Sequence, residues 1–282
     1  MVSNLEKMAN KLSIRLIPEV HRLDGATTMA AHEFLTTLGK PALLISHFEP
    51  GTVTFGKGVS FDSLPEVCRN GNIPFVRRET GGEILYHDPR DITYGFAAVP
   101  ESSKIDVTRA MLLVMSWLMD GLDSLGMRTL TNLDGSIFVK EANGYRKIGG
   151  NAVKKDVNKP YLIHGSIFYD YPDFPLLEKV YGARTEELRK VITCMREQRD
   201  VPIGAAYAAI RYGFSEGGRK LVEEPFSEQE WSEIRKLASK YQSITHAKGR
   251  GKHGKVCATT WTNERERRRF MPPQLDGRTI YD

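Results

Sequence analysis

Apolar residues recur at helical spacing in four stretches of the chain and predict four helices. The clearest spans Val107–Leu125, where the buried face repeats every three or four residues and Gly126 provides the stop. The others are expected to begin at Thr27 or Thr28, at Thr185, and at a capping box from Ser227 to Glu230. The helix from Thr185 is predicted to carry its apolar face as far as Met195.

Short runs rich in β-formers predict strands between and before these helices. They are Val53–Phe55, Ile73–Arg77, Glu83–Tyr86, Thr93–Val99, Ser136–Val139, Arg146–Val153 and Ile163–Tyr169. Most of them fall in the middle of the chain, whereas most helices fall outside it. Segregated strands and helices indicate an α+β fold, with a mixed or antiparallel β-sheet core and flanking helices.

The length of 282 residues allows one large domain with a small appendage. We expect the main domain to span residues 1–245. Residues 246–282 then form a basic C-terminal tail, too short for a full accessory domain and without a hydrophobic period. Within the tail, Gly249–Lys255 has the glycine-rich, charged composition of a solvated linker, and Glu264–Arg269 is a mixed charge run.

Composition narrows the class of protein without naming an activity. Forty Lys and Arg against 35 Asp and Glu give a formal charge of +5, which fits an anionic small ligand or an acidic protein partner as well as nucleic acid, so charge alone does not decide the partner. No apolar run reaches the roughly 20 residues of a membrane helix, and the first residues lack a secretory apolar core. The three cysteines, Cys68, Cys194 and Cys257, have no metal-ligand spacing and suit a reducing compartment. We therefore expect a cytoplasmic protein without a permanently bound metal.

Three stretches carry candidate chemistry. Arg77–Glu83 reads RRETGGE, in which arginines suit carboxylate or phosphate and paired glycines let the backbone approach a ligand, although an ordinary hairpin turn has the same composition. Asn143–Ala152 reads NGYRKIGGNA and predicts a hairpin that returns through Lys147, which is either a site lysine or a solvent-facing one. Ile163–Ser166 reads IHGS, with a histidine on a strand.

In this order and spacing, the three stretches resemble the motifs of the lipoate–protein ligase and octanoyltransferase superfamily, which is related to the biotin ligases. The usual family forms are RRxSGGGAVYHD, KISGxA and HGT. The resemblance extends over about Ala30 to Tyr241, and Ala30–Leu35 is similar to the family's early helix. It implies the biotin/lipoate protein ligase catalytic domain as the fold.

The resemblance also implies roles for individual residues. It makes Lys147 the catalytic lysine, which stabilises charge on an acyl adenylate and polarises its carbonyl. It makes Asn132 and Asp134 candidates for contacting nucleotide and Mg²⁺. The residues implied to bind lipoate or lipoyl-AMP are Arg77, Arg78, Thr80, Gly81, Gly82, His87, Gly150, Asn151, Ala152, His164 and Gly165.

Two departures from the family pattern bear on the reaction. Glu83 replaces the third glycine of the loop, as in some octanoyltransferase relatives. The loop Thr131–Gly135 lacks the nucleophilic cysteine that carrier-dependent octanoyltransferases use there, and an adenylating ligase needs no thiol. We therefore predict a lipoate–protein ligase that uses ATP and Mg²⁺ to form lipoyl-AMP. The alternative is an octanoyl or lipoyl transferase that takes its acyl group from a carrier protein without ATP, and a non-enzymatic binding protein also stays open.

The resemblance implies protein partners as well. The expected acceptors are lipoyl domains of 2-oxoacid dehydrogenase acyltransferase subunits, or the glycine cleavage H protein. Because the chain lacks the large C-terminal domain of bigger ligases, a separate accessory subunit is a further expected partner. We expect neither a membrane nor nucleic acid as a partner.

Overall fold

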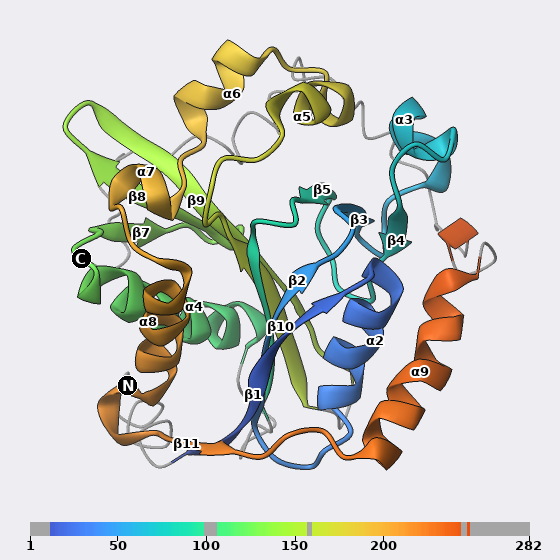
Figure 1. Cartoon of the computed structure of the whole chain (residues 1–282), viewed down its shortest axis with the longest axis vertical. Coiled ribbons are helices and arrows are strands. Elements are labelled where there is room, and N and C mark those ends of the chain that lie inside the picture. The colour runs from blue at the N-terminus through green and yellow to red at the C-terminus, as the bar shows by residue number, and fades with distance from the viewer. Residues whose placement is uncertain (1–11, 99–105, 157–159, 244–246, 249–282) are drawn as a thin grey trace.

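The computed structural model describes residues 12–98, 106–156, 160–243 and 247–248, and an eight-stranded mixed sheet forms its centre (Figure 1). The strand order is β11-β1-β2-β6-β10-β9-β8-β7. The first three strands run parallel to one another, and every later pairing is antiparallel. Their bounds are β1 Ser13–Leu23, β2 Ala42–Phe48, β6 Ile92–Ala98, β7 Thr129–Thr131, β8 Ser136–Glu141, β9 Gly144–Lys154, β10 Tyr161–Ile167 and β11 Lys220–Glu223.

A second, three-stranded sheet lies beside the first and provides the other wall of the site. Its order is β4-β3-β5, with β3 (Thr52–Phe55) parallel to β4 (Phe75–Arg77) and antiparallel to β5 (Ile84–His87). Its apolar side chains form one cluster with those of α5 (Phe174–Tyr181) and α6 (Thr185–Val191).

Helices cover both faces of the large sheet (Figure 1). One face packs against α4 and α8 in a core rich in aromatic side chains, and the other packs against α2 and α9. The remaining bounds are α2 Gly25–Leu35, α3 Glu66–Arg69, α4 Val107–Ser124, α7 Met195–Gln198, α8 Ile203–Ser215 and α9 Glu228–Gln242, with short 3₁₀ turns at Phe61–Ser63 and Glu216–Gly218. The mixed sheet with flanking helices confirms the predicted α+β class.

Each predicted strand is present, with its ends shifted by up to two residues, but four others were missed. The longest of these, β1, contains Pro18, which removes a ladder donor, and its pairing with β2 shifts register between Ile17 and His21. The next, β2, is buried along its whole length and therefore has no polar alternation. The two short strands β7 and β11 are only three and four residues long.

The helix predictions were right in type and partly wrong in extent. The helix α4 and the capping box of Ser227 and Glu230 are confirmed. The cap of α2 is Asp24, not a threonine, and its carboxylate accepts the backbone N–H groups of Ala26 and Thr27. The helix predicted from Thr185 to Met195 is wrong, because the chain leaves the helix after Val191 and starts a new one, α7, at Met195.

The predicted tail lies, apart from Ala247 and Lys248, outside the described residues, as do Gly249–Lys255, Cys257 and Glu264–Arg269. Ala247 is buried, and its carbonyl accepts two hydrogen bonds from Arg77. Across the described ranges, no helix is both long and apolar enough to cross a bilayer.

Candidate functional site

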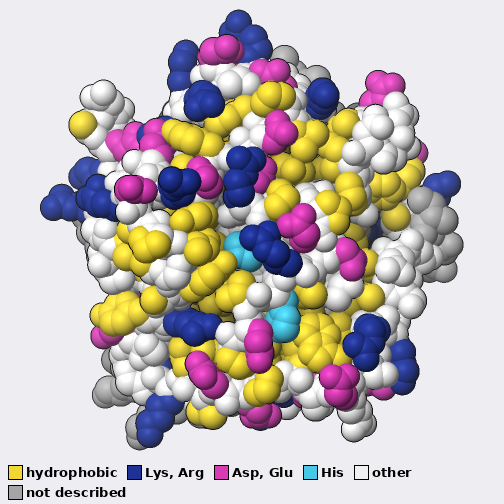
Figure 2. Space-filling view, viewed as in Figure 1, with side chains coloured by type: hydrophobic (Ala, Val, Ile, Leu, Met, Phe, Trp, Pro, Cys, Tyr) yellow, Lys and Arg dark blue, Asp and Glu magenta, His cyan; other side chains and the backbone are white. Residues whose placement is uncertain are grey.

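A pocket lies between the two sheets, and residues of all three candidate stretches line it. Ten of the predicted site residues are in its wall: Arg78, Gly82, His87, Asp134, Lys147, Gly150, Asn151, Ala152, His164 and Gly165. Near the middle of the face shown in Figure 2, histidine side chains lie beside Lys or Arg and among hydrophobic side chains.

The position of Lys147 depends on an irregularity in β9. The pairing of β8 with β9 skips Ile148, since Ile137 pairs with Gly149 and Phe138 with Lys147. Such a bulge changes the direction in which nearby side chains point. The Lys147 side chain is buried, and a β-carbon built on Gly150 would lie 3.5 Å from its Nζ, so the amine lies over that glycine.

The segment that interrupts the predicted helix pairs with this bulge. Ile192 forms a parallel bridge with Lys147, and the Thr193 N–H donates to the Lys147 carbonyl at 2.9 Å. The Ile148 carbonyl accepts the Phe168 N–H at 2.8 Å. Both carbonyls at the irregularity are therefore satisfied, and the backbone that carries Lys147 is held on two sides.

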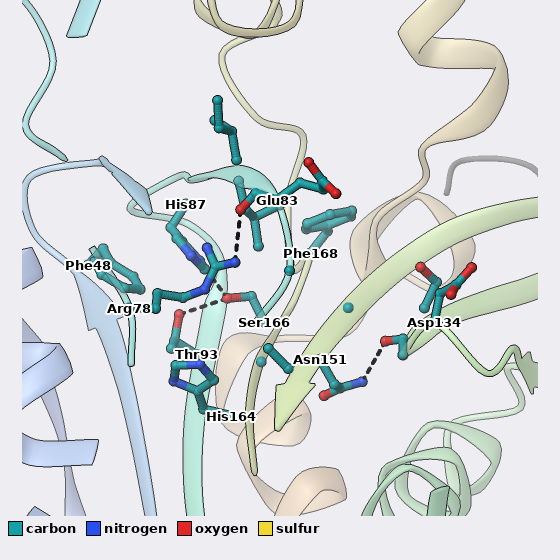
Figure 3. Close-up of a pocket in the computed structure, with 18 of the residues that line it drawn as sticks. Phe48, Arg78, Glu83, His87, Thr93, Asp134, Asn151, His164, Ser166 and Phe168 are labelled. Carbon is teal, nitrogen blue, oxygen red and sulfur yellow. Dashed lines mark hydrogen bonds between the residues drawn. The ribbon is translucent and has the colours of Figure 1, made fainter. Parts of the chain in front are cut away.

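The mouth of the pocket is held by Asn151. Its Nδ2 donates to the Gly135 carbonyl at 3.1 Å, its backbone N–H donates to the same oxygen at 2.7 Å, and its Oδ1 accepts from the Tyr94 hydroxyl. Figure 3 shows Asp134 on the opposite side of the pocket from Phe48 and His87. Asn132 does not line the pocket. Its Oδ1 accepts the N–H groups of Asp134 and Ser136 and so holds the turn that carries Asp134.

The two arginines of RRETGGE, Arg77 at the end of β4 and Arg78 directly after it, have different surroundings. Arg78 lines the pocket, donates to Thr54 Oγ1 at 2.6 Å and holds the glycine loop through the carbonyls of Gly81 and Glu83. Arg77 does not line the pocket and donates to the carbonyls of Val59 and Ala247, so the structure places it as a structural residue. Neighbouring strand residues face opposite ways, which the motif alone does not resolve.

Three more residues of that motif, Glu79, Thr80 and Gly81, do not line the pocket. Thr80 is buried, and its Oγ1 lies 2.8 Å from His164 Nε2. Glu79 is held by lysines from three segments, Lys57, Lys154 and Lys240, at 3.6, 3.4 and 2.8 Å. Although burial raises it, the hydrogen bond and charge of Lys240 and the charges of the other two lower the pKa of Glu79 to about 2.

Three histidines lie in the pocket wall and share a network of hydroxyl groups. His87 Nδ1 lies 2.8 Å from Ser166 Oγ, and its Nε2 lies 2.9 Å from Thr54 Oγ1, while its ring stacks on Phe48. His32 and His164 meet through their Nδ1 atoms at 3.1 Å. Burial, aided for His87 and His164 by nearby positive groups, lowers the pKa of all three, so the pocket holds neutral imidazoles.

Twelve lining residues had not been predicted, and half of them have apolar or aromatic side chains. They are Met29, His32, Phe48, Glu83, Ile84, Leu85, Thr93, Gly135, Ser136, Ser166, Phe168 and Tyr181. Strand β2 was missed, so Phe48 could not be placed. His32 was within the stretch that resembles the family's early helix, which was the available signal.

The cysteines of the described ranges are not placed for catalysis in the pocket. Cys68 and Cys194 are fully buried and do not line it. Burial raises the pKa of Cys68 to about 12 and that of Cys194 to about 11, so both thiols stay protonated near neutral pH.

Comparison with characterised proteins agrees with the motifs. The octanoyltransferase LipM of Clostridioides difficile is 28% identical over 192 residues, which are 59% of this chain and 69% of that protein. LipM of Bacillus subtilis is 24% identical over 72% of this chain and 84% of its own length.

Solved structures share the fold. A chain of the Thermoplasma acidophilum lipoylation system, a bipartite lipoate protein ligase with its E2 lipoyl domain, superposes with a TM-score of 0.73 at 21% identity, covering 84% of this chain and 97% of that one. A lipoate-protein ligase A bound with ATP gives 0.71 at 21% identity, covering 84% and 99%. The family model of the lipoyl protein ligase A/B catalytic domain matches residues 24–214, and the chain belongs to that family.

Proposed function

We propose that this enzyme transfers a medium-chain acyl group, octanoyl or lipoyl, from a carrier protein to a lysine of a lipoyl domain, without ATP. The observation that carries the proposal is the pocket between the sheets, with Lys147 buried in its wall and apolar side chains along its length. Similarity to octanoyltransferases over most of their length favours a carrier-bound thioester as the donor. This reverses the preference for ATP that the missing cysteine suggested.

The residues at the mouth supply the chemistry that such a transfer needs. The amine of the acceptor lysine attacks the thioester carbonyl, the carbon–sulfur bond breaks, and the carrier thiolate takes the proton that the amine loses. The negative charge that develops on the carbonyl oxygen is offset by the Lys147 amine in a site that excludes much of the water. Because no cysteine in the described ranges lines the pocket, the proposal needs no acyl-enzyme.

One observation favours a second candidate, the ATP-dependent ligation of lipoate. The pocket joins Lys147 to a carboxylate at the mouth, Asp134, and its described lining has no thiol. A buried ammonium suits an acyl phosphate mixed anhydride as well as a thioester, and Asp134 could hold Mg²⁺ on a bound nucleotide.

The donor decides between the two candidates. The purified chain is incubated with a lipoyl domain and either octanoyl-carrier protein without nucleotide, or octanoate with ATP and Mg²⁺, and the mass of the lipoyl domain is measured. The same arms are run with lipoyl donors and with a glycine cleavage H protein as acceptor. We expect modification from the carrier without ATP. Modification only from the free acid with ATP would overturn the proposal in favour of the ligase.

A cysteine variant tests the direct route. Cys257 lies outside the described residues, and Cys257→Ser is expected to transfer the acyl group from the carrier at the wild-type rate. A loss of transfer in Cys257→Ser, with retained circular dichroism, would show that an acyl-enzyme forms and would contradict direct attack.

A further inference from the structure

The two ends of the pocket differ in character. Gly82 and Asp134, two residues at the mouth, are exposed. Lys147 lies on the same strand as Gly150, which is half-buried. The end lined by α2, β2 and β6, which we call the closed end, is buried, and its lining side chains are at most 5% exposed. The residues of the closed end are Met29, His32, Phe48 and Thr93, together with His87, His164 and Ser166, which contact them. An acyl group whose carbonyl lies near Lys147 therefore directs its far end toward this group.

The closed end places polar groups beside the apolar Met29 and Phe48, and an alkyl chain does not require them. Thr93 Oγ1 lies 3.0 Å from Ser166 Oγ, which in turn contacts His87 (Figure 3). His164 contacts Thr80 through Nε2 and His32 through Nδ1. A methyl terminus can form no hydrogen bond with buried hydroxyl and imidazole groups, so this lining favours a far end that can.

His32 is the member of this network with an unused polar atom. Its side chain is fully buried on α2, its Nδ1 contacts His164, and its Nε2 has no hydrogen-bond partner among the described residues. One proton lies between the two Nδ1 atoms, so His32 Nε2 is a donor if His164 donates that proton and an acceptor if His32 does. In both tautomers one buried nitrogen is left for a ligand.

The position of His32 is built into the sheet. Its ring lies over Gly95 of β6, where any β-carbon would come within 2.4 Å of the ring. Glycine at this position leaves the space that the imidazole fills, and His164 pairs with the same Gly95 in the β10–β6 ladder. The two imidazoles therefore lie side by side on the floor of the pocket, with ring centroids 5.3 Å apart.

We propose that the His32–His164 pair is a specificity determinant that selects an acyl group bearing sulfur atoms at its far end, so that lipoyl is preferred to octanoyl. This inference rests on the proposed acyl transfer and names the substrate of the same pocket. Sulfur is polarisable, contacts aromatic ring edges favourably and accepts weak hydrogen bonds. Octanoyl ends in a methyl group, which cannot form a hydrogen bond with His32 Nε2.

The neutrality of the imidazoles supports a sulfur-bearing group over an anionic one. Burial lowers the pKa of His32 to about 3, so the pair carries no charge near neutral pH. An acyl chain ending in a carboxylate would be desolvated there without a counter-charge from the pair, which is unfavourable.

The experiment compares two donors in one enzyme. Transfer to a lipoyl domain is followed with lipoyl-carrier and octanoyl-carrier protein, and the ratio of the two kcat/KM values is determined. We expect a ratio of about ten in favour of lipoyl for the wild type, and of about one for His32→Leu, because leucine removes the polar atom at similar size. His32→Asn, which keeps a hydrogen-bonding side chain, is expected to retain part of the preference.

A buried histidine outside the pocket is the matched control. His47 has a pKa that burial lowers in the same direction, contacts Tyr207 and does not line the pocket, so His47→Leu should leave the ratio at the wild-type value. Calorimetric binding of free lipoate and octanoate gives the same comparison without turnover. A wild-type preference for octanoyl, or a ratio unchanged in a folded His32→Leu, would overturn the inference. Absence of transfer from either donor would instead refute the proposed function.

Discussion

At the scale of residues, the mouth of the pocket depends on the contact between Gly135 and Asn151. Gly135 has a φ of +85° and its carbonyl accepts two hydrogen bonds from Asn151. A β-carbon at Gly135 would lie 2.6 Å from the Asn151 carbonyl oxygen, which is backbone and has little freedom to move. The site therefore requires glycine next to Asp134 for both conformation and space.

The Gly135→Ala variant tests this requirement. We expect it to lower the free energy of unfolding by about 2–3 kcal/mol, since the left-handed conformation and the backbone clash both cost energy. Gly39 is the matched control, because its φ is +67° and nothing lies within 4 Å of the added carbon. Gly39→Ala should cost only about 1 kcal/mol. If urea denaturation gives the same loss of unfolding free energy for both variants, the close approach to Asn151 does not contribute to stability.

The sequence predicted site residues where a motif marked them and missed those that depend on the fold. Lys147, Arg78 and His164 belong to the motifs and line the pocket as predicted. Arg77 belongs to the same motif as Arg78 but does not line the pocket. Phe48 enters from a strand with no polar alternation. Which face a residue takes is set by strand pairing, and the pattern near each motif was too short to fix it.

At the scale of elements, α9 belongs to the architecture of the site although it follows the family-matched residues 24–214. Lys240 Nζ lies 2.9 Å from Glu33 on α2 and 2.8 Å from Glu79 in the glycine loop. Tyr241 adds a hydrogen bond to Glu33. The capping box predicts where this helix begins. It does not predict the contacts of Lys240 and Tyr241 at the C-terminal end, because their partners are distant in sequence.

Lys240→Met is expected to raise the KM for the acyl donor about tenfold with little change in kcat, because Glu79 then loses its shortest ion pair and the loop from Arg78 to Gly82 is less well held. Lys236 is the matched control, since it is on the same helix, largely exposed and paired only with Glu233 among the described contacts. Lys236→Met should leave KM within about twofold. A KM unaffected by Lys240→Met would show that the ion pair between Lys240 and Glu79 has a structural role only.

The helix predicted from Thr185 to Met195 is interrupted after Val191 by a contact between elements. Leu188, Val191, Ile192 and Met195 have helical spacing, yet Ile192 leaves the helix to pair with Lys147. Pairing with a distant bulge competes with local propensity, and tertiary context prevails. No local pattern contains that information, so the prediction failed where the backbone supports the site.

At the scale of the whole molecule, the pocket makes the fold sensitive to acid. His32, His87 and His164 are buried and neutral, and burial lowers the pKa of each. Their unfolded forms take up protons below about pH 6.5 while the folded forms do not, so stability falls as pH decreases. Glu79, whose pKa is lowered to about 2, adds a loss only below about pH 4.5.

We therefore predict that the free energy of unfolding decreases by several kcal/mol between about pH 6 and pH 4.5, since each protonated histidine adds about 1.4 kcal/mol per pH unit. Chemical denaturation at a series of pH values measures the slope. His32→Leu should have a shallower slope by about one proton. A wild-type slope near zero above about pH 4.5 would contradict the neutral histidine cluster.

The central claim is that Lys147 promotes acyl transfer in the pocket between the sheets. The most direct measurement is single-turnover transfer from an acyl-carrier protein to a lipoyl domain by the wild type, Lys147→Met and the exposed control Lys140→Met on the neighbouring strand. The account predicts a loss of at least about a hundredfold for Lys147→Met and a change within about twofold for Lys140→Met. Transfer by a folded Lys147→Met at the wild-type rate would contradict it.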